Sequence, residues 1–90
     1  MKTLFNIEFW EIPHGGHMFA GPELFESKLV ESTLEDIDKF ITSKTDGYKV
    51  SFRKLTKKEQ KEYKRLGYDF DYKASNHCFY SVKPAKVEVI

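Results

Sequence analysis

The sequence predicts a single α+β domain over residues 1–90, built as a mostly antiparallel sheet of four to five strands with two helices. Three observations lead to this class. Several segments alternate apolar and polar residues with the period of a strand, and two Ser/Thr-x-x-Glu capping boxes start helical segments between them. The 90 residues, 40% hydrophobic and 16% aromatic, are enough to form one modest core. The expected order is strand, strand, helix, strand, helix, strand, strand.

The first two segments are expected to form an antiparallel pair. Residues 3–12 place Phe5, Ile7 and Phe9 on one face and Trp10 on the other, so the first three are core candidates. A connection rich in glycine and proline follows at residues 13–22. Residues 24–31 are interpreted as the second strand. A helix starting after the Gly-Pro pair at 21–22 remains open for this segment.

The first helix is expected to begin at Ser32, which forms a capping box with Glu35. Its apolar face is predicted from four residues at helical spacing, which are Leu34, Ile37, Phe40 and Ile41. Acidic residues in the first turns suit the helix dipole. They are expected to face water.

A third strand and a second helix are expected in the middle of the chain. Residues 48–54 alternate between an apolar and a basic face after a turn at Asp46-Gly47. Thr56 and Glu59 form the second capping box, and Gly67 is placed to end a helix over residues 57–66. That helix is poorly apolar, with Leu55, Tyr63 and Leu66 as anchors, and is expected on the surface.

The remaining strands are expected at residues 68–72 and 77–83, with a turn at 74–76 and a last β-branched segment at 86–90. The natural packing for this order places both helices on one face of the sheet.

The sequence favours no catalytic, metal or cofactor site. His14 and His17 lie in a glycine-bearing loop and His77 precedes Cys78, a pattern that lacks the ligand spacing of a zinc site. The single cysteine excludes an internal disulfide, and Cys78 is expected to be buried and inert. Phosphate-loop, nucleophile-elbow and metalloprotease motifs are absent from the sequence. We therefore expect a non-enzyme without metal or cofactor.

No apolar run approaches the length of a membrane span, and the first ten residues are too short and acidic for a signal peptide. A cytoplasmic protein that does not bind membranes is expected.

The net charge of +1 conceals two opposed blocks. Residues 1–46 carry nine acids against four lysines, and residues 47–90 carry eleven bases against five acids. Such blocks can steer charged partners, or can be solvated surfaces only.

The leading hypothesis is a non-catalytic binding module that inhibits or regulates a protein or nucleoprotein partner. The expected partner-binding residues are aromatic or methionine anchors and acidic residues that imitate phosphates, namely Trp10, Met18, Phe19, Glu31, Glu35, Asp36 and Asp38. In size and lysine-rich composition the chain is similar to the accessory proteins that bacteriophages and mobile elements encode to block host machinery. That resemblance covers no motif and implies an inhibitor of the anti-defence type.

The alternative is a small RNA- or DNA-binding protein that uses the basic segment. Its candidate residues are Lys49, Arg53, Lys54, Lys57, Lys61, Lys64 and Arg65. Two observations count against it: lysines outnumber arginines thirteen to two, and Glu59 and Glu62 lie among the lysines at pairing distance. Unpaired sheet edges are compatible with a monomer or a homodimer.

Overall fold

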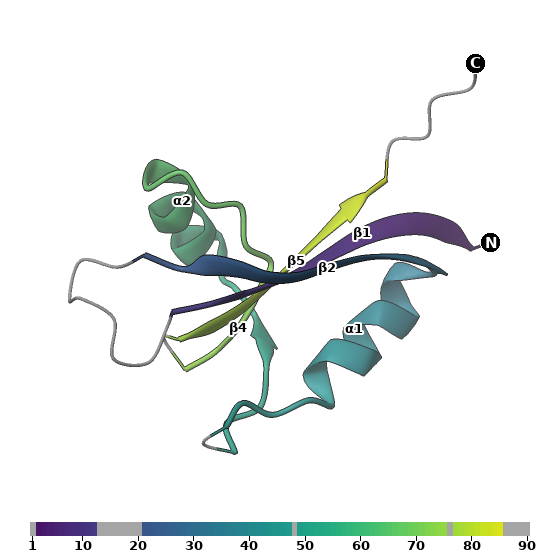
Figure 1. Ribbon diagram of the computed structural model, residues 1–90, viewed down its shortest axis with the longest axis horizontal. Coiled ribbons are helices and arrows are strands. Elements are labelled where there is room, and N and C mark those ends of the chain that lie inside the picture. Colours follow the sequence, from purple (N-terminus) through teal and green to yellow (C-terminus); the bar gives the residue numbers. More distant parts are fainter. Residues whose placement is uncertain (1, 13–20, 48, 76, 86–90) are drawn as a thin grey trace.

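A computed structural model describes residues 2–12, 21–47, 49–75 and 77–85. The elements are β1 (Thr3–Glu11), β2 (Glu23–Ser32), α1 (Leu34–Thr42), β3 (Arg53–Lys54), α2 (Lys57–Arg65), β4 (Tyr72–Ala74) and β5 (Cys78–Pro84). The strands form one antiparallel sheet in the order β2-β1-β5-β4-β3 (Figure 1). The α+β class and the predicted order of elements are confirmed.

The long strands β1, β2 and β5 form the centre of the sheet and one of its edges. β1 pairs with β2 on one side, where Ile7 faces Lys28, and with β5 on the other, where Ile7 faces Val82. The β1–β2 register shifts between Phe9 and Trp10, so β2 carries a bulge near its start. The second strand predicted at residues 24–31 is therefore confirmed, and β2 is an edge strand.

Both faces of the sheet are covered by apolar groups. On one face Phe5, Ile7 and Cys78 pack in a cluster with Ile37 and Ile41 of α1. The α1 and α2 helices lie on opposite sides of the sheet (Figure 1). The expectation that both helices share one face was wrong.

The second face is covered by α2 and the segment that follows it. Phe79 of β5 packs there with Leu55 and Phe70, and Trp10 and Tyr63 flank this cluster. Because Cys78 and Phe79 are adjacent on one strand, they point to opposite faces, and each face has an apolar residue to bury.

α1 begins one residue later than predicted. Its N-cap is Thr33, whose Oγ1 accepts a hydrogen bond from the Asp36 amide at 3.1 Å, while Ser32 is the last residue of β2. Ile37 and Ile41 are buried, but the side chains of Leu34 and Phe40 are 64% and 47% exposed. The predicted apolar face is therefore wider than the surface that the helix buries.

α2 begins and ends where its sequence signals lie. Thr56 and Glu59 form the predicted capping box, and Gly67 takes a left-handed φ of 94° after the last turn. Leu55 is buried and Tyr63 packs beside it, whereas Leu66 is 71% exposed and does not anchor the helix.

The strand predicted at residues 48–54 is reduced to a single bridge and two residues. The Asp46 carboxylate accepts the Val50 amide at 2.8 Å, and the Val50 carbonyl accepts the Asp46 amide at 2.9 Å, which closes a turn. Ser51 bridges to Thr45, and regular pairing starts only at Arg53 in β3.

The strand expected at residues 68–72 was also misplaced. Tyr68 and Phe70 form a non-strand segment with stacked rings, and β4 begins at Tyr72 and includes Ala74, which was expected in a turn. The segment 86–90 lies outside the described residues. Within the described part of the chain, no helix is long and apolar enough to cross a membrane.

Candidate nucleic-acid interface

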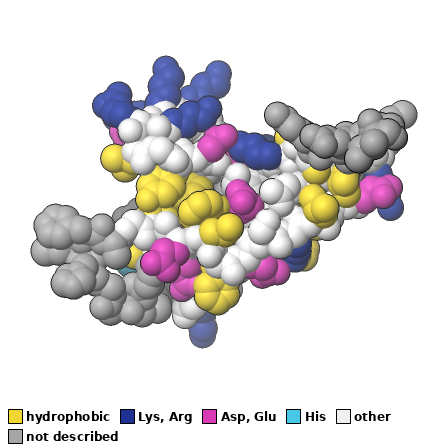
Figure 2. All heavy atoms as spheres, turned by 45° about the horizontal axis from the view of Figure 1, so that its top comes forward, with side chains coloured by type: hydrophobic (Ala, Val, Ile, Leu, Met, Phe, Trp, Pro, Cys, Tyr) yellow, Lys and Arg dark blue, Asp and Glu magenta, His cyan; other side chains and the backbone are white. Residues whose placement is uncertain are grey.

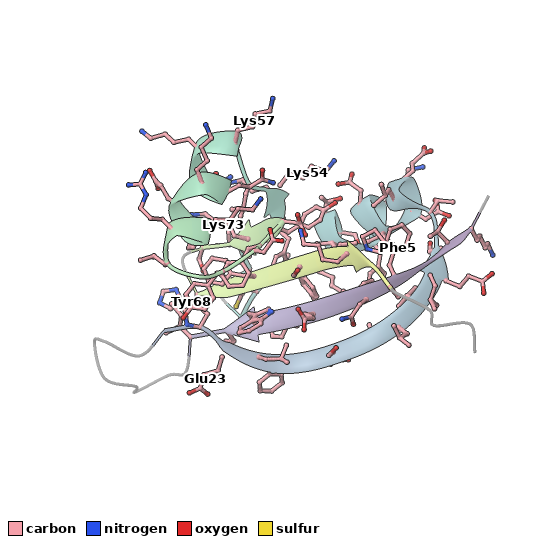
Figure 3. The ribbon with its side chains drawn as sticks, turned by 90° about the horizontal axis from the view of Figure 1, so that it is seen from above. Phe5, Glu23, Lys54, Lys57, Tyr68 and Lys73 are labelled. Atoms are coloured by element: carbon pink, nitrogen blue, oxygen red, sulfur yellow. The ribbon has the colours of Figure 1, made fainter. Side chains whose placement is uncertain are left out.

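Five cationic side chains occupy the solvent side of α2. Lys57, Lys58, Lys61, Lys64 and Arg65 are all exposed. At about 100° per residue they share the half of the helix that faces away from Tyr63, which packs against the sheet. Figure 2 shows Lys and Arg side chains gathered over this helix, and in Figure 3 Lys57 extends away from the strands. Part of the basic block of the sequence thus forms one cationic surface, which we call the α2 cationic surface.

Glu59, in the first turn of this helix, is turned away from that surface. Its carboxylate accepts two hydrogen bonds from Arg53, at 2.8 and 2.9 Å, and one from the Thr56 amide at 3.0 Å. The Lys73 ammonium, which lies between α2 and the sheet (Figure 3), is 3.3 Å from the same carboxylate. The bonds from Arg53 and the Thr56 amide hold the pKa of Glu59 far below its usual range.

Few acids remain to neutralise the α2 cationic surface. Glu62 is exposed on the helix, and Lys64 makes a long, exposed ion pair with Asp69 at 3.9 Å. Lys57, Lys58, Lys61 and Arg65 form no ion pair with any described residue. An exposed pair such as Lys64–Asp69 contributes little, so most of this positive charge remains available.

The other basic candidates are placed differently. Arg53 is held in its ion pair with Glu59, and the Lys54 ammonium lies 3.7 Å from Asp38 of α1. Lys49 is exposed in the turn that Asp46 closes, and Asp46 lines a cavity with Phe9 and Cys78 on the α1 side. The structure therefore brings together the four α2 candidates and leaves Lys49 away from them.

Trp10, the described member of the expected aromatic anchors, lies under other rings. It is partly buried, with its ring centroid 6.1 Å from that of Tyr68 and 5.8 Å from that of Phe70. Met18 and Phe19 lie outside the described residues.

The expected acidic candidates are not gathered on one surface. Glu31 faces Leu4, on the same side of the sheet as Trp10, whereas Glu35, Asp36 and Asp38 belong to α1 on the other side. Asp38 accepts the Tyr72 hydroxyl at 2.8 Å, and Glu35 lies 3.5 Å from Lys39.

The groups considered for catalysis or metal binding lie apart. Cys78 is buried, and that burial raises the pKa of its thiol. His77 is exposed, and His14 and His17 lie outside the described residues. No group of three or more metal-ligating side chains occurs among the residues that the structure describes.

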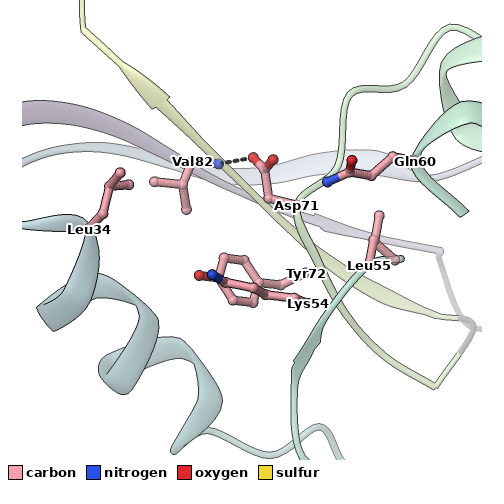
Figure 4. A pocket seen from close by; sticks show the side chains of 7 residues that line it. All are labelled: Leu34, Lys54, Leu55, Gln60, Asp71, Tyr72 and Val82. Atoms are coloured by element: carbon pink, nitrogen blue, oxygen red, sulfur yellow. Dashed lines mark hydrogen bonds between the residues drawn. The ribbon is translucent and has the colours of Figure 1, made fainter. Parts of the chain in front are cut away.

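A cavity of about 220 Å³ opens beside β5, at the segment that precedes β4 (Figure 4). Asp71 lines it and takes over pairing that β4 does not provide, since its carboxylate accepts the Val82 amide at 2.7 Å and the Lys83 ammonium at 3.1 Å. Burial lowers the pKa of Lys83, but Asp71 and Asp69 more than offset this, and the net shift is upward. The Asp71 carboxylate therefore holds β5 to the segment that precedes β4.

Comparison with family models, with curated proteins and with solved structures finds no match to this chain.

The feature that sequence reasoning missed is the inward direction of Glu59. The capping box gave the signal, because a carboxylate that reaches back to the N-cap amide cannot also pair with lysines on the outer face.

Proposed function

We propose that this chain is a non-catalytic binding module that docks on the phosphate backbone of a nucleic acid or nucleoprotein through the α2 cationic surface. The observation that carries the proposal is the division of charge on α2. Five cations face solvent, while Glu59 is held beneath them by Arg53 and Lys73. Clustered lysines that release counterions from phosphates supply most of the free energy of such binding.

The chemistry of these cations favours backbone contact over base reading. Lysine ammonium groups act as point charges, whereas bidentate recognition of guanine requires arginine. Arg53 is committed to Glu59, so Arg65 is the remaining arginine on this side. The expected binding is therefore indifferent to sequence and sensitive to salt.

The packing under α2 favours a rigid presentation of this charge. Tyr63 meets the rings of Phe70 and Phe79 edge to face at 5.5 and 5.2 Å, and Phe70 stacks on Phe79 at 4.4 Å. Because the helix rests on this aromatic layer, little backbone ordering has to accompany binding.

The non-catalytic part of the proposal is supported by the state of Cys78. A buried thiol with a raised pKa is a poor nucleophile at neutral pH.

A second candidate, an inhibitor or regulator that binds a protein partner, is favoured by the outer edge of β2. Phe25 and Leu29 of that strand are 73% and 64% exposed. Edge strands with apolar side chains accept added strands from other chains. A cytoplasmic accessory protein that blocks host machinery would use either surface in the same way, by covering part of its partner.

The test is titration of a fluorescently labelled DNA duplex and a labelled single-stranded RNA, read by anisotropy over a series of salt concentrations. Binding is expected at low salt, with a dissociation constant of about 1–100 μM at physiological salt. The logarithmic salt slope on the duplex should be about −4, as four to five neutralised phosphates imply. No binding at low salt, or a slope near zero, would refute the proposal.

A further inference from the structure

The outer edge of β2 is the longest strand edge left open in the described part of the chain. β2 has ten residues and stands at the end of the strand order, and no described strand pairs with its outer side. The bulge is at Phe25, which has no partner on β1, and residues 26–32 keep a regular register with that strand. Leu24, Phe25 and Leu29 are 48%, 73% and 64% exposed. A regular edge flanked by apolar side chains favours pairing with another strand.

We propose that a second copy of this chain covers the edge, with β2 pairing antiparallel to its own copy about a two-fold axis through Ser27. The result is a continuous ten-stranded sheet. Ser27 is favoured as the centre by the residues that this register places opposite each other.

Symmetry restricts the registers that are available. A two-fold axis perpendicular to the sheet preserves its faces, so each side chain meets one from the same face. The axis must therefore pass midway between one residue and its own copy. Centring on Glu26 places two carboxylates opposite each other, and centring on Lys28 places two ammonium groups opposite each other. Such like-charge pairs are destabilising. Centring on Leu29 brings no opposite charges together, because Glu26 then faces Ser32 and Lys28 faces Val30 of the second copy.

The register centred on Ser27 gives complementary pairs. Glu26 faces Lys28 of the second copy, and symmetry repeats the pair on the other side of the axis. Within one chain the Lys28 ammonium lies 4.0 Å from the Glu26 carboxylate and 5.6 Å from the Phe40 ring, and the Glu26 and Lys28 side chains are 59% and 45% exposed. Exposed contacts of this kind contribute little, so both side chains can turn toward the second copy. Phe25 lies in the bulge, where its ring meets that of Phe9 edge to face at 5.9 Å, so it stands outside this regular pairing.

The symmetry of this pairing also fixes where the helices lie. Because the axis preserves the faces of the sheet, both α2 helices of the dimer stand on one face and both α1 helices on the other. The dimer itself does not depend on the proposed function. The dimer places two α2 cationic surfaces on the same face, where they can bind one nucleic acid together. That consequence of the dimer rests on the proposed function.

The test measures self-association by sedimentation equilibrium, without nucleic acid, for the wild type and three variants. Glu26→Lys and Lys28→Glu each replace two attractive pairs with two repulsive ones, so each should weaken dimerisation about tenfold or more. The double variant Glu26→Lys/Lys28→Glu restores opposite charges across the axis and should return the dissociation constant toward the wild-type value. Circular dichroism checks that each variant is folded.

The matched control is Leu34→Lys, at an exposed position of α1 outside the edge, which should leave the dimer unchanged. A wild type that stays monomeric at every concentration overturns the proposal and leaves the edge to a strand of a different protein. A dimer that ignores both single reversals, or that the double variant fails to restore, also overturns it. Nucleic-acid binding by a purely monomeric protein would leave the proposed function standing, so the two failures are distinguishable.

Discussion

Arg53 and Glu59 form a two-bond ion pair that ties β3 to the first turn of α2. Arg53 donates to the two carboxylate oxygens at 2.8 and 2.9 Å, and one of these oxygens also accepts the Thr56 amide. This arrangement caps the helix and draws the acid of its first turn inward. The positive charge on the outer side is thereby left with few neighbouring acids.

Replacing Glu59 with Gln should therefore destabilise the fold. The variant keeps the shape but loses the charged partner of Arg53 and Lys73 and weakens the cap, at a cost of about 1–2 kcal/mol in unfolding free energy. Urea denaturation measures this. The control is Glu62→Gln on the exposed side of the same helix, which should change stability by less than about 0.5 kcal/mol. Equal losses from the two variants would remove the structural role assigned to Glu59.

The same carboxylate should make stability depend on pH in acid. The folded-state pKa of Glu59 is lowered from its ordinary value of 4.5, so its contribution is fully present above pH 4.5 and is lost as pH falls toward the folded-state value. Denaturation midpoints measured between neutral pH and strong acid should fall less steeply for Glu59→Gln than for the wild type. Parallel profiles would contradict this assignment.

Tyr72 should produce the opposite dependence in alkali. Burial and its hydrogen bond to Asp38 raise its pKa above the ordinary value of 10, so its stabilising contribution is present below pH 10 and is lost as pH rises above it. Tyr72→Phe should cost about 1 kcal/mol at neutral pH and should reduce the alkaline loss. Some loss should remain, because burial also raises the pKa of Tyr80. An unchanged alkaline profile for Tyr72→Phe would exclude this role.

The aromatic layer under α2 should be essential to the fold. Phe79 is 1% exposed and stacks on Phe70, so Phe79→Ala should cost about 3–5 kcal/mol. Leu66→Ala, at the 71% exposed residue after α2, serves as the control and should cost less than about 1 kcal/mol. Thermal unfolding of both variants tests this. A mild effect at Phe79 would mean that the second apolar cluster does not support the domain.

The local signals in the sequence were sufficient for most elements. The alternation of Phe5 and Ile7 predicted β1, and the Thr56–Glu59 box predicted the start of α2. The Ser32–Glu35 box predicted the first cap one residue too early. Ser32 is the last residue of β2, so the hydroxyl of Thr33 caps α1 instead. The strand expected at 48–54 failed because the Asp46 carboxylate holds a turn that competes with pairing.

The site was harder to predict because it depends on the third dimension. Helical spacing placed Glu59 among the lysines, but its direction depends on Arg53 and Lys73, which come from other elements. The covering of Trp10 likewise depends on Tyr68 and Phe70, far along the chain. The placement of the helices on opposite faces followed from Phe79, whose neighbour Cys78 faces the other cluster.

The most direct test of the α2 cationic surface compares Lys57→Glu/Lys61→Glu with Lys2→Glu/Lys39→Glu, which changes net charge equally at exposed lysines outside α2. Anisotropy titrations on one duplex at a fixed low salt concentration give both affinities. The α2 variant should bind at least about tenfold more weakly than the wild type, with a shallower salt slope, while the control stays within about threefold. Equal losses from both variants would mean that net charge alone drives binding, and that result would contradict the account.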